Sequence, residues 1–204
     1  MIVYGSSVSP YVRKVLFFMG EKGLVAEHLP IRFHDPLPAF QAASPFGLIP
    51  AFADEDFTLS DSTAICHYLE RKHPNPALLP DEAAALGRVI WLEEFLDTSL
   101  TPTILKLFRN LVLKPKVLNI PPDMAEVDAA LLQLPALLDY LQAQINGPFL
   151  VGDSVSLADI AAACPFLNLK MAGHALDAER WPVLAAYIAN LLARPAHMCI
   201  TDKR

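Results

Sequence analysis

The chain has 204 residues, of which 53% are hydrophobic, so it is long enough and apolar enough to bury one large core or two small ones. Acidic residues outnumber basic residues 22 to 16 and the basic residues form no stripe, which argues against a surface for nucleic acid or anionic membrane. No apolar run reaches the roughly 18 residues of a membrane span, and no basic flank precedes an apolar core at the start of the chain. We therefore expect a soluble, cytoplasmic protein that acts on small molecules.

The cysteines and histidines show no pattern of metal ligation or disulfide pairing. Cys66, Cys164 and Cys199 are far apart and lie in apolar contexts, so we interpret them as reduced packing residues. His67 and His73 are spaced wrongly for one helix face, and the other histidines are isolated. We expect no metal site.

Up to about residue 73 the chain alternates between strand-like and helix-like patterns. The clearest helix begins with Ser9 as its cap and Pro10 at its first position, and it ends at Gly23. This part predicts a four-stranded sheet with helices on its faces, in the order β-α-β-α-β-β-α. The expected elements cover residues 1–4, 9–23, 25–31 and 36–43, then two short strands around the acidic turn 54–56 and a helix from Ser62.

The stretch from Ser44 to Tyr68 has features that suit a receptor for an amino-acid-like or peptide ligand. Pro50 cannot donate to a strand ladder, so we expect it at a strand start, where a cis Ile49-Pro50 bond would turn the Ile49 peptide groups toward an extended ligand. Ser62 lies at a helix start, where its hydroxyl and free backbone N–H groups make a small anion site. Asp61 beside it could hold an ammonium group.

After residue 73 prolines punctuate the chain and strand patterns almost vanish. Pro74, Pro76 and Pro80 indicate a linker, beyond which we expect only helices. Ser156 and Asp159 form a capping-box pattern that predicts a helix start. We expect three other helices. The first runs through Leu86, Ile90, Trp91 and Phe95 with a kink at Pro102, and the second runs through Val127, Leu131, Leu134, Leu138, Leu141 and Ile145 with a kink at Pro135. Pro115, Pro121 and Pro122 are expected to break the chain between these two, and the third helix runs from Trp181-Pro182 to Arg194-Pro195.

Several motifs occur in an order that resembles the cytosolic glutathione S-transferase family, over essentially the whole chain, and in particular its bacterial serine-type members of theta, zeta or nu type. They are Ser9-Pro10-Tyr11-Val12-Arg13, Gly47-Leu48-Ile49-Pro50, Asp61-Ser62, Ser156-x-x-Asp159 and the closing Arg194-Pro195. The resemblance implies an α/β thioredoxin-like N-terminal domain with a four-stranded mixed sheet at residues 1–74, a linker at 75–82 and an all-α C-terminal domain at 83–204. It also implies a homodimer, with the helices that start near Ser62 and Asp81 at the interface.

The resemblance further implies a site for glutathione as co-substrate. Ser9 stands where serine-type members keep the hydroxyl that hydrogen-bonds the glutathione sulfur. Ile49, ahead of a cis Pro50, would pair its backbone with the cysteinyl part of glutathione. Asp61 and Ser62 would hold the γ-glutamyl ammonium and carboxylate. A hydroxyl donor at a helix N-terminus favours the thiolate, which would attack an electrophilic carbon or a peroxide.

Three positions depart from the family pattern, and the role of a fourth is open. Leu48, which we include in the glutathione site, stands where a polar or basic residue is common, and it offers only its backbone. Asp61 is one methylene shorter than the commoner glutamate, and Thr63 stands where some classes place an arginine. Arg13 either assists the site electrostatically or is an exposed helix arginine.

Other hydroxyl groups compete with Ser9 for the role of activating the thiol. Ser6 and Ser7 lie in the preceding turn. Tyr4 and Tyr11 carry phenols of the kind that other family members use. The spacing to the arginine and the position at the helix start favour Ser9, with Ser7 next.

The resemblance places the pocket for the second substrate between the two domains. Its mostly apolar residues suit a hydrophobic electrophile. The leading interpretation is an enzyme that transfers glutathione to such an electrophile, with peroxide reduction or dehalogenation as variants. A non-catalytic member of the fold that binds or regulates a partner, and a ligandin that stores apolar compounds, are the alternatives. The expected pocket residues are Tyr11, Thr98, Pro102, Leu105 and Phe108.

Overall fold

The chain divides into two compact units. The computed structural model describes residues 1–32 and 34–201. The first unit holds residues 1–79 together with the C-terminal segment from Ala193, and the second holds residues 80–192. The sequence placed that C-terminal segment in the helical domain, whereas by its contacts it belongs to the first unit. The prediction for Cys199 lies outside the described side chains.

A four-stranded mixed sheet forms the centre of the first unit, as predicted. Its strands are β1 (Ile2–Tyr4), β2 (Glu27–Leu29), β3 (Ala51–Asp54) and β4 (Phe57–Ser60), in the spatial order β2-β1-β3-β4. β1 pairs in parallel with β2 and antiparallel with β3, and β3 pairs antiparallel with β4. The second strand is shorter than the predicted run 25–31, because Pro30 has no N–H to extend the ladder.

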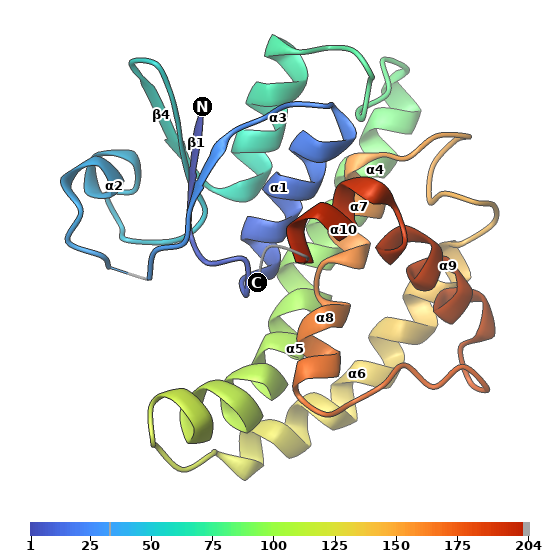
Figure 1. The fold of residues 1–204 in the computed structure, drawn as a ribbon. Coiled ribbons are helices and arrows are strands. Elements are labelled where there is room, and N and C mark those ends of the chain that lie inside the picture. The colour runs from blue at the N-terminus through green and yellow to red at the C-terminus, as the bar shows by residue number, and fades with distance from the viewer. Residues whose placement is uncertain (33, 202–204) are drawn as a thin grey trace. The chain divides into compact units, whose positions relative to one another are not determined.

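Helices cover both faces of this sheet (Figure 1). α1 (Pro10–Glu21) and α3 (Ser62–Lys72) pack together on one face, and α2 (Pro38–Ala43) lies against β3 and β4 on the other. This arrangement confirms the predicted thioredoxin-like β-α-β-α-β-β-α unit.

A tenth α-helix, which the sequence did not predict, packs on α1. The last helix was expected to run to Arg194-Pro195, but α9 (Pro182–Leu192) ends earlier and α10 (Pro195–Thr201) follows it. The Arg194 guanidinium, in the turn between them, makes two hydrogen bonds of 2.6 and 2.7 Å to the Glu21 carboxylate at the end of α1. This bidentate pair and the proline at the first position of α10 start a new helix there.

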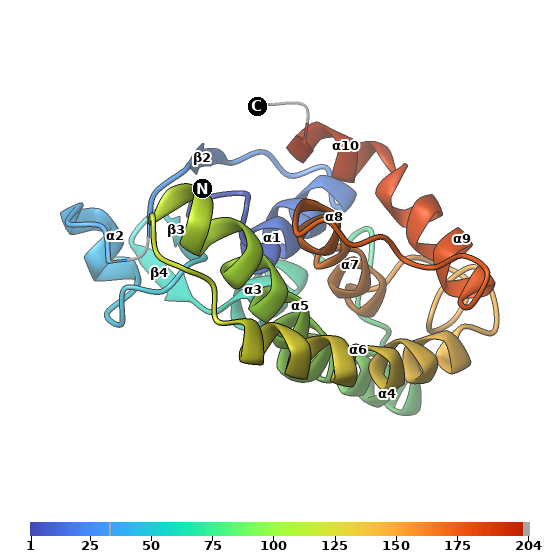
Figure 2. The ribbon, with the colours of Figure 1, turned by 90° about the horizontal axis from the view of Figure 1, so that it is seen from below.

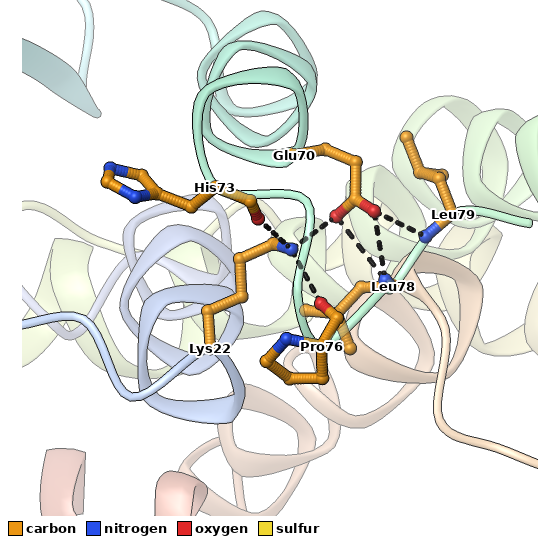
Figure 3. A network of polar contacts seen from close by, with 6 residues as sticks. All are labelled: Lys22, Glu70, His73, Pro76, Leu78 and Leu79. Carbon is orange, nitrogen blue, oxygen red and sulfur yellow. Dashed lines mark hydrogen bonds and ion pairs between the residues drawn. The ribbon is translucent and has the colours of Figure 1, made fainter.

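A polar network fastens the segment that leads out of α3 (Figure 3). The buried Lys22 ammonium lies 2.7 Å from Glu70 Oε2, and it donates to the backbone carbonyls of His73 and Pro76, both at 2.7 Å. Glu70 in turn accepts the backbone N–H of Leu78 at 3.1 Å. Because all these groups lie in the first unit, the network keeps this part of the predicted linker folded onto α1 and α3.

A long helical run and four further helices make up the second unit. The run consists of α4 (Ala83–Phe95), the π-helical turn η1 (Leu96–Leu100), α5 (Thr101–Phe108) and the π-helical segment η2 (Arg109–Val117). α6 (Met124–Gln144) returns along it, as Figure 2 shows, and α7 (Leu157–Ala163), α8 (Phe166–Met171) and α9 complete the unit. The described part of this unit contains no strand, in agreement with the predicted all-α domain.

Two prolines of the long run behave differently from each other. Pro102 lies in the first turn of α5, directly after η1, where the irregular turn accommodates its missing N–H. Pro115 was expected to break the chain, and this is wrong, because it lies inside η2. The backbone N–H of Leu118 donates to the carbonyl of Leu113 at 2.9 Å, so the wide π-type bond passes over the proline.

The apolar faces of the two long helices differ in part from those that the sequence marked. α4 buries Val89 and Leu92 and leaves Trp91 56% exposed. The Trp91 indole N–H donates to the Tyr140 hydroxyl on α6 at 2.9 Å, which explains how an exposed tryptophan is held there. α6 buries the marked residues Val127, Leu134, Leu138 and Leu141, and Leu131 is exposed.

The predicted capping box at the start of α7 is confirmed. The fully buried Asp159 carboxylate accepts the backbone N–H of Ser156 at 2.8 Å and its hydroxyl at 2.7 Å. It also accepts the backbone N–H of Leu150 at 2.8 Å and the Tyr187 hydroxyl at 2.6 Å. Burial, followed by the charge of Asp159, raises the pKa of Tyr187 well above its usual value, so this phenol stays a donor. The motif therefore organises folding of the second unit.

No helix in the described part of the chain is both long and apolar enough to span a membrane.

Candidate functional site

Ser9 lies at the N-terminus of α1, where the sequence placed it. Its oxygen accepts the backbone N–H of Val12 at a long distance of 3.5 Å, and its own N–H donates to the Ser6 carbonyl at 3.0 Å. No described residue accepts a hydrogen bond from the Ser9 hydroxyl. The half-buried hydroxyl therefore keeps its proton for a ligand, at the positive end of a helix.

Gly5 brings the Ser9 loop close to the loop that carries Ile49. Its φ of +134° is a conformation that favours glycine, and a Cβ here would lie 2.6 Å from Val12 Cγ2 and 2.9 Å from the Ile49 Cβ. The end of β1 thus passes between α1 and Ile49 with no room for a side chain. Val12, in the first turn of the helix that Ser9 caps, and Ile49 therefore both lie next to Gly5.

The Ile49-Pro50 bond is cis, as predicted, and the loop before it is closed by one hydroxyl. The buried Ser44 hydroxyl accepts the Leu48 N–H at 2.9 Å and donates to the Leu48 carbonyl at 2.7 Å. Gly47, at φ +67°, lies so close to the His34 ring that a side chain there would collide with it. The loop before Ile49 is therefore held by contacts within the first unit.

This geometry changes what Leu48 can offer. Both of its backbone groups are occupied by Ser44, and its side chain is 55% exposed, so Leu48 presents apolar surface and no free backbone group. The backbone N–H and C=O of Ile49, by contrast, make no hydrogen bond within the described part of the chain. Ile49 therefore offers a backbone edge, which Leu48 does not.

Asp61 and Ser62 lie side by side at the start of α3. Asp61, not Ser62, is the cap, because its Oδ1 accepts the Ala64 N–H at 3.0 Å and Ser62 is the first helical residue. The second Asp61 oxygen accepts no hydrogen bond from a described residue, and the carboxylate is exposed. Asp61 has φ +82°, a strained conformation for a residue with a side chain and one that clusters at functional sites.

A lysine that the sequence analysis did not single out reaches the same helix start. The Lys14 side chain of α1 is buried, and its ammonium donates to the Thr63 hydroxyl at 3.1 Å. Position 63 holds a threonine and not the arginine of some classes, but Lys14 brings a positive charge from α1 to the start of α3. No local sequence signal identifies this, since the contact joins residues far apart in the chain.

An ion pair anchors α3 to the hairpin of β3 and β4. Asp54 at the end of β3 lies 2.6 Å from the Lys72 ammonium and accepts the Tyr68 hydroxyl at 3.0 Å. The hydrogen bond from Lys72 holds the pKa of the Asp54 carboxyl below its usual value, and that from Tyr68 adds to it. The carboxylate thus fixes the last turns of the helix whose first turn carries Asp61.

The rivals of Ser9 are placed less favourably. The Ser6 oxygen accepts the Val8 N–H at 3.3 Å, and Tyr4 is buried and packs against the Phe40 ring. Ser7 and Tyr11 are half-buried. Only Ser9 caps the helix.

Arg13 is completely buried, so the interpretation of an exposed helix arginine is wrong. Its Nη1 donates to the backbone carbonyls of Ser7 at 2.7 Å and Val8 at 3.0 Å. The guanidinium therefore holds the loop that precedes Ser9.

The residues expected to line the electrophile pocket lie on both units. Tyr11 is on α1, whereas Thr98, Pro102, Leu105 and Phe108 follow one another along the long helical run of the second unit. Phe108 is buried, Pro102 and Leu105 are half-buried, and Thr98 is exposed. Whether these five residues share one pocket stays a prediction.

Among the described residues, no three His, Cys, Asp or Glu side chains come together as ligands for a metal ion.

Two sequence families match the chain, one for each part. The family described as "Glutathione S-transferase, N-terminal domain" matches residues 3–77, and "Glutathione S-transferase, C-terminal domain" matches residues 100–195. The probable glutathione S-transferase GSTF2 of Oryza sativa subsp. japonica is 31% identical over 204 residues, covering 96% of this chain and 93% of that protein. Glutathione S-transferase 3 of Zea mays is 33% identical over 201 residues, covering 95% and 90%.

Solved structures of similar sequence have the same fold. A glutathione S-transferase from Rhodospirillum rubrum F11 is 29% identical and superposes with a TM-score of 0.91, covering 100% of this chain and 92% of that chain. Glutathione S-transferase-I, solved with lactoylglutathione bound, is 27% identical with a TM-score of 0.88 and covers 98% of both chains. The similarity extends over both units.

Proposed function

The chain belongs to the glutathione S-transferase family, and we propose that it is a glutathione transferase that joins the thiol of glutathione to a hydrophobic electrophile, with Ser9 activating the thiol. The observation that carries this proposal is the hydroxyl of Ser9, which caps α1 and donates to no described residue. It lies on the same unit as the open backbone edge of Ile49 and the Asp61-Ser62 pair.

Ile49, Asp61 and Ser62 suit the cysteinyl backbone, the γ-glutamyl ammonium and the γ-glutamyl carboxylate of glutathione. The N–H and C=O of Ile49 pair with the backbone of the cysteinyl residue, as one strand pairs with another. The unbonded oxygen of Asp61 takes the γ-glutamyl ammonium. Ser62, at the start of α3, takes the γ-glutamyl carboxylate with its hydroxyl and backbone N–H.

The chemistry asks little more of the protein than a stabilised thiolate. A free thiol has a pKa of about 8.5, so only a few per cent is ionised at pH 7. The Ser9 hydroxyl donates to the sulfur, and the N–H of Val12 donating to the same oxygen makes that hydroxyl a better donor. Lowering the thiol pKa by about two units is worth roughly 2.7 kcal/mol and leaves most of the bound sulfur nucleophilic. The thiol proton goes to solvent, and the thiolate forms a carbon–sulfur bond as the leaving group departs.

Finer features of the enzyme are also part of the proposal. We place the chain among serine-type members, since Tyr4 is buried in the core and Ser9 alone caps the helix. We expect a cytoplasmic homodimer with domain bounds near residues 74 and 83. Peroxide reduction or halide displacement would use the same thiolate. The residues proposed to contact the electrophile are Tyr11, Thr98, Pro102, Leu105 and Phe108.

Substitution of Ser9 tests this assignment. We expect Ser9→Ala to lower kcat at pH 7 with an aromatic chloride electrophile by about 25-fold, the loss of thiolate that follows when the thiol pKa rises again by two units, while the protein still binds glutathione. Ser7→Ala is the matched control, since it removes a hydroxyl from the same loop and should leave kcat unchanged. Equal losses in both variants, or none in Ser9→Ala, would contradict the role of Ser9.

A further inference from the structure

We propose that Arg13 is a positioning residue for Ser9, which aims the Ser9 hydroxyl by holding the two peptide groups that precede it. This inference rests on the proposed function of Ser9. It assigns Arg13 a role through the loop and not a direct one on the glutathione sulfur.

The Arg13 guanidinium donates hydrogen bonds to two consecutive peptide groups. Nη1 donates to the Ser7 carbonyl at 2.7 Å and to the Val8 carbonyl at 3.0 Å. The second of these carbonyls belongs to the peptide that joins Val8 to Ser9. Fixing it fixes the positions of the Ser9 N and Cα atoms, because a peptide group is planar, and the φ of −71° at Ser9 then sets the direction of the Cα–Cβ bond.

Two further hydrogen bonds, both to Ser6, close the loop before Ser9. The Ser9 N–H donates to the Ser6 carbonyl at 3.0 Å, and the Val8 N–H donates to the Ser6 hydroxyl at 3.3 Å. These bonds set the turn, and Arg13 holds the Ser7 and Val8 carbonyls. The same residue also continues the helix, since its backbone N–H donates to the Ser9 carbonyl at 3.1 Å. Arg13 therefore joins both sides of Ser9 to the first turn of α1.

The complete burial of Arg13 explains why an arginine stands here. A planar guanidinium offers several donors in fixed directions, and hydrogen bonds from a charged donor are stronger than neutral ones. A lysine ammonium ends a flexible stem that is shorter than the arginine side chain, so it would hold the two carbonyls less firmly than the guanidinium does. With no exposed surface, the guanidinium acts behind the loop. A misplacement of about 1 Å at a reacting group costs on the order of 100-fold in rate, so such a support matters for catalysis.

A double-mutant cycle between positions 9 and 13 tests the proposal with the full chain. Arg13→Met keeps most of the apolar stem and removes the guanidinium, and Arg71→Met removes an exposed arginine from α3 of the same unit as a control. kcat is measured with reduced glutathione and an aromatic chloride electrophile. The pKa of bound glutathione is measured from the ultraviolet absorbance of the thiolate against pH, and thermal melts show that each variant is folded.

We expect Arg13→Met alone to raise the pKa of the bound thiol by about one to two units and so to lower kcat at pH 7 by about threefold to 25-fold, which is no more than the loss in Ser9→Ala. The Kd for glutathione should change by less than about threefold, since Ile49, Asp61 and Ser62 hold the rest of the ligand. In the Ser9→Ala background the same substitution should change kcat by less than about twofold, because no hydroxyl remains to be aimed. Arg71→Met should resemble the unsubstituted protein.

Two results would overturn the inference, and they are distinguishable from each other. If Arg13→Met lowers kcat by the same factor with and without the Ser9 hydroxyl, Arg13 acts independently of Ser9 and the positioning role is wrong. If Ser9→Ala itself keeps full activity, the proposed function of Ser9 fails, and the role of Arg13 fails with it. Should Arg13→Met not fold, the same cycle with Arg13→Lys decides, since a partly restored support of the loop should give an intermediate kcat only when Ser9 is present.

Discussion

The Ser44 hydroxyl holds the loop that carries Ile49. We therefore predict that Ser44→Ala weakens glutathione binding, although Ser44 is not proposed to contact glutathione. The buried Ser44 hydroxyl makes two hydrogen bonds to Leu48, of 2.9 and 2.7 Å. Each is worth about 1 kcal/mol net, so their loss lowers the free energy of unfolding by about 1 to 2 kcal/mol. The loss should lie near 1 kcal/mol if a water molecule takes the place of the Ser44 hydroxyl and bonds to Leu48, which is 55% exposed.

The same substitution changes binding because an ordered loop becomes a mobile one. Glutathione must then order the residues before Ile49 on binding, and we expect Kd to rise by about tenfold, or 1.4 kcal/mol. Calorimetric titration measures Kd, and urea unfolding measures stability. Thr58→Ala, which removes an exposed hydroxyl from β4, is the control and should alter neither quantity by more than about 0.5 kcal/mol. An unchanged Kd in Ser44→Ala, with reduced stability, would refute preorganisation of this loop.

Three further predictions concern the stability of each unit. Tyr187→Phe removes a buried 2.6 Å hydrogen bond to the Asp159 carboxylate and should lower the free energy of unfolding by about 2 kcal/mol; a loss below about 0.5 kcal/mol in urea unfolding would contradict the bond. Lys22→Met should speed hydrogen exchange of the Leu78 amide, and equal exchange in both proteins would show that the network is not needed to hold this segment. The pKa of Asp54 is lowered, so its carboxylate adds stability above the ordinary value of 3.8, and this is lost as pH falls through its lowered native value. The Tm difference between the protein and Asp54→Asn should therefore be constant near neutral pH and shrink below about pH 4; a difference that grows with acid would refute this.

The elements that the sequence predicted well carry their signals within a few residues. Ser9 followed by Pro10 started α1 at the predicted position, and Ser156 with Asp159 formed the predicted capping box. In both cases the side chain satisfies backbone groups of its own turn, so the local sequence holds all of the information.

The features that the sequence missed depend on contacts between distant residues. Arg194 pairs with Glu21 from the other end of the chain, which stops α9 early and begins α10. Pro115 fits inside a helix because η2 is wide, and no residue pattern indicates a π-helix. The burial of Arg13 likewise depends on where the preceding loop folds back.

The site residues proposed from the sequence stay a prediction, and the structure adds details of their placement. The sequence identified Ser9, Ile49, Asp61 and Ser62, and the structure places all four on the first unit. It assigned backbone contacts to Leu48, whose backbone groups are in fact bonded to a buried serine. The sequence cannot show this, because a local pattern does not tell whether the backbone groups of Leu48 or those of Ile49 are hydrogen-bonded within the protein.

A calorimetric titration of the protein with reduced glutathione, run in two buffers of different ionisation enthalpy, tests the central claim most directly. The heat gives the stoichiometry and Kd, and its dependence on the buffer gives the protons released when the thiol ionises. At pH 7 we expect saturable binding of one glutathione per chain with release of about 0.7 proton, binding that Ser62→Ala weakens, and loss of the proton release in Ser9→Ala. The absence of heat at millimolar glutathione, or binding without proton release, would contradict a site built to activate the thiol.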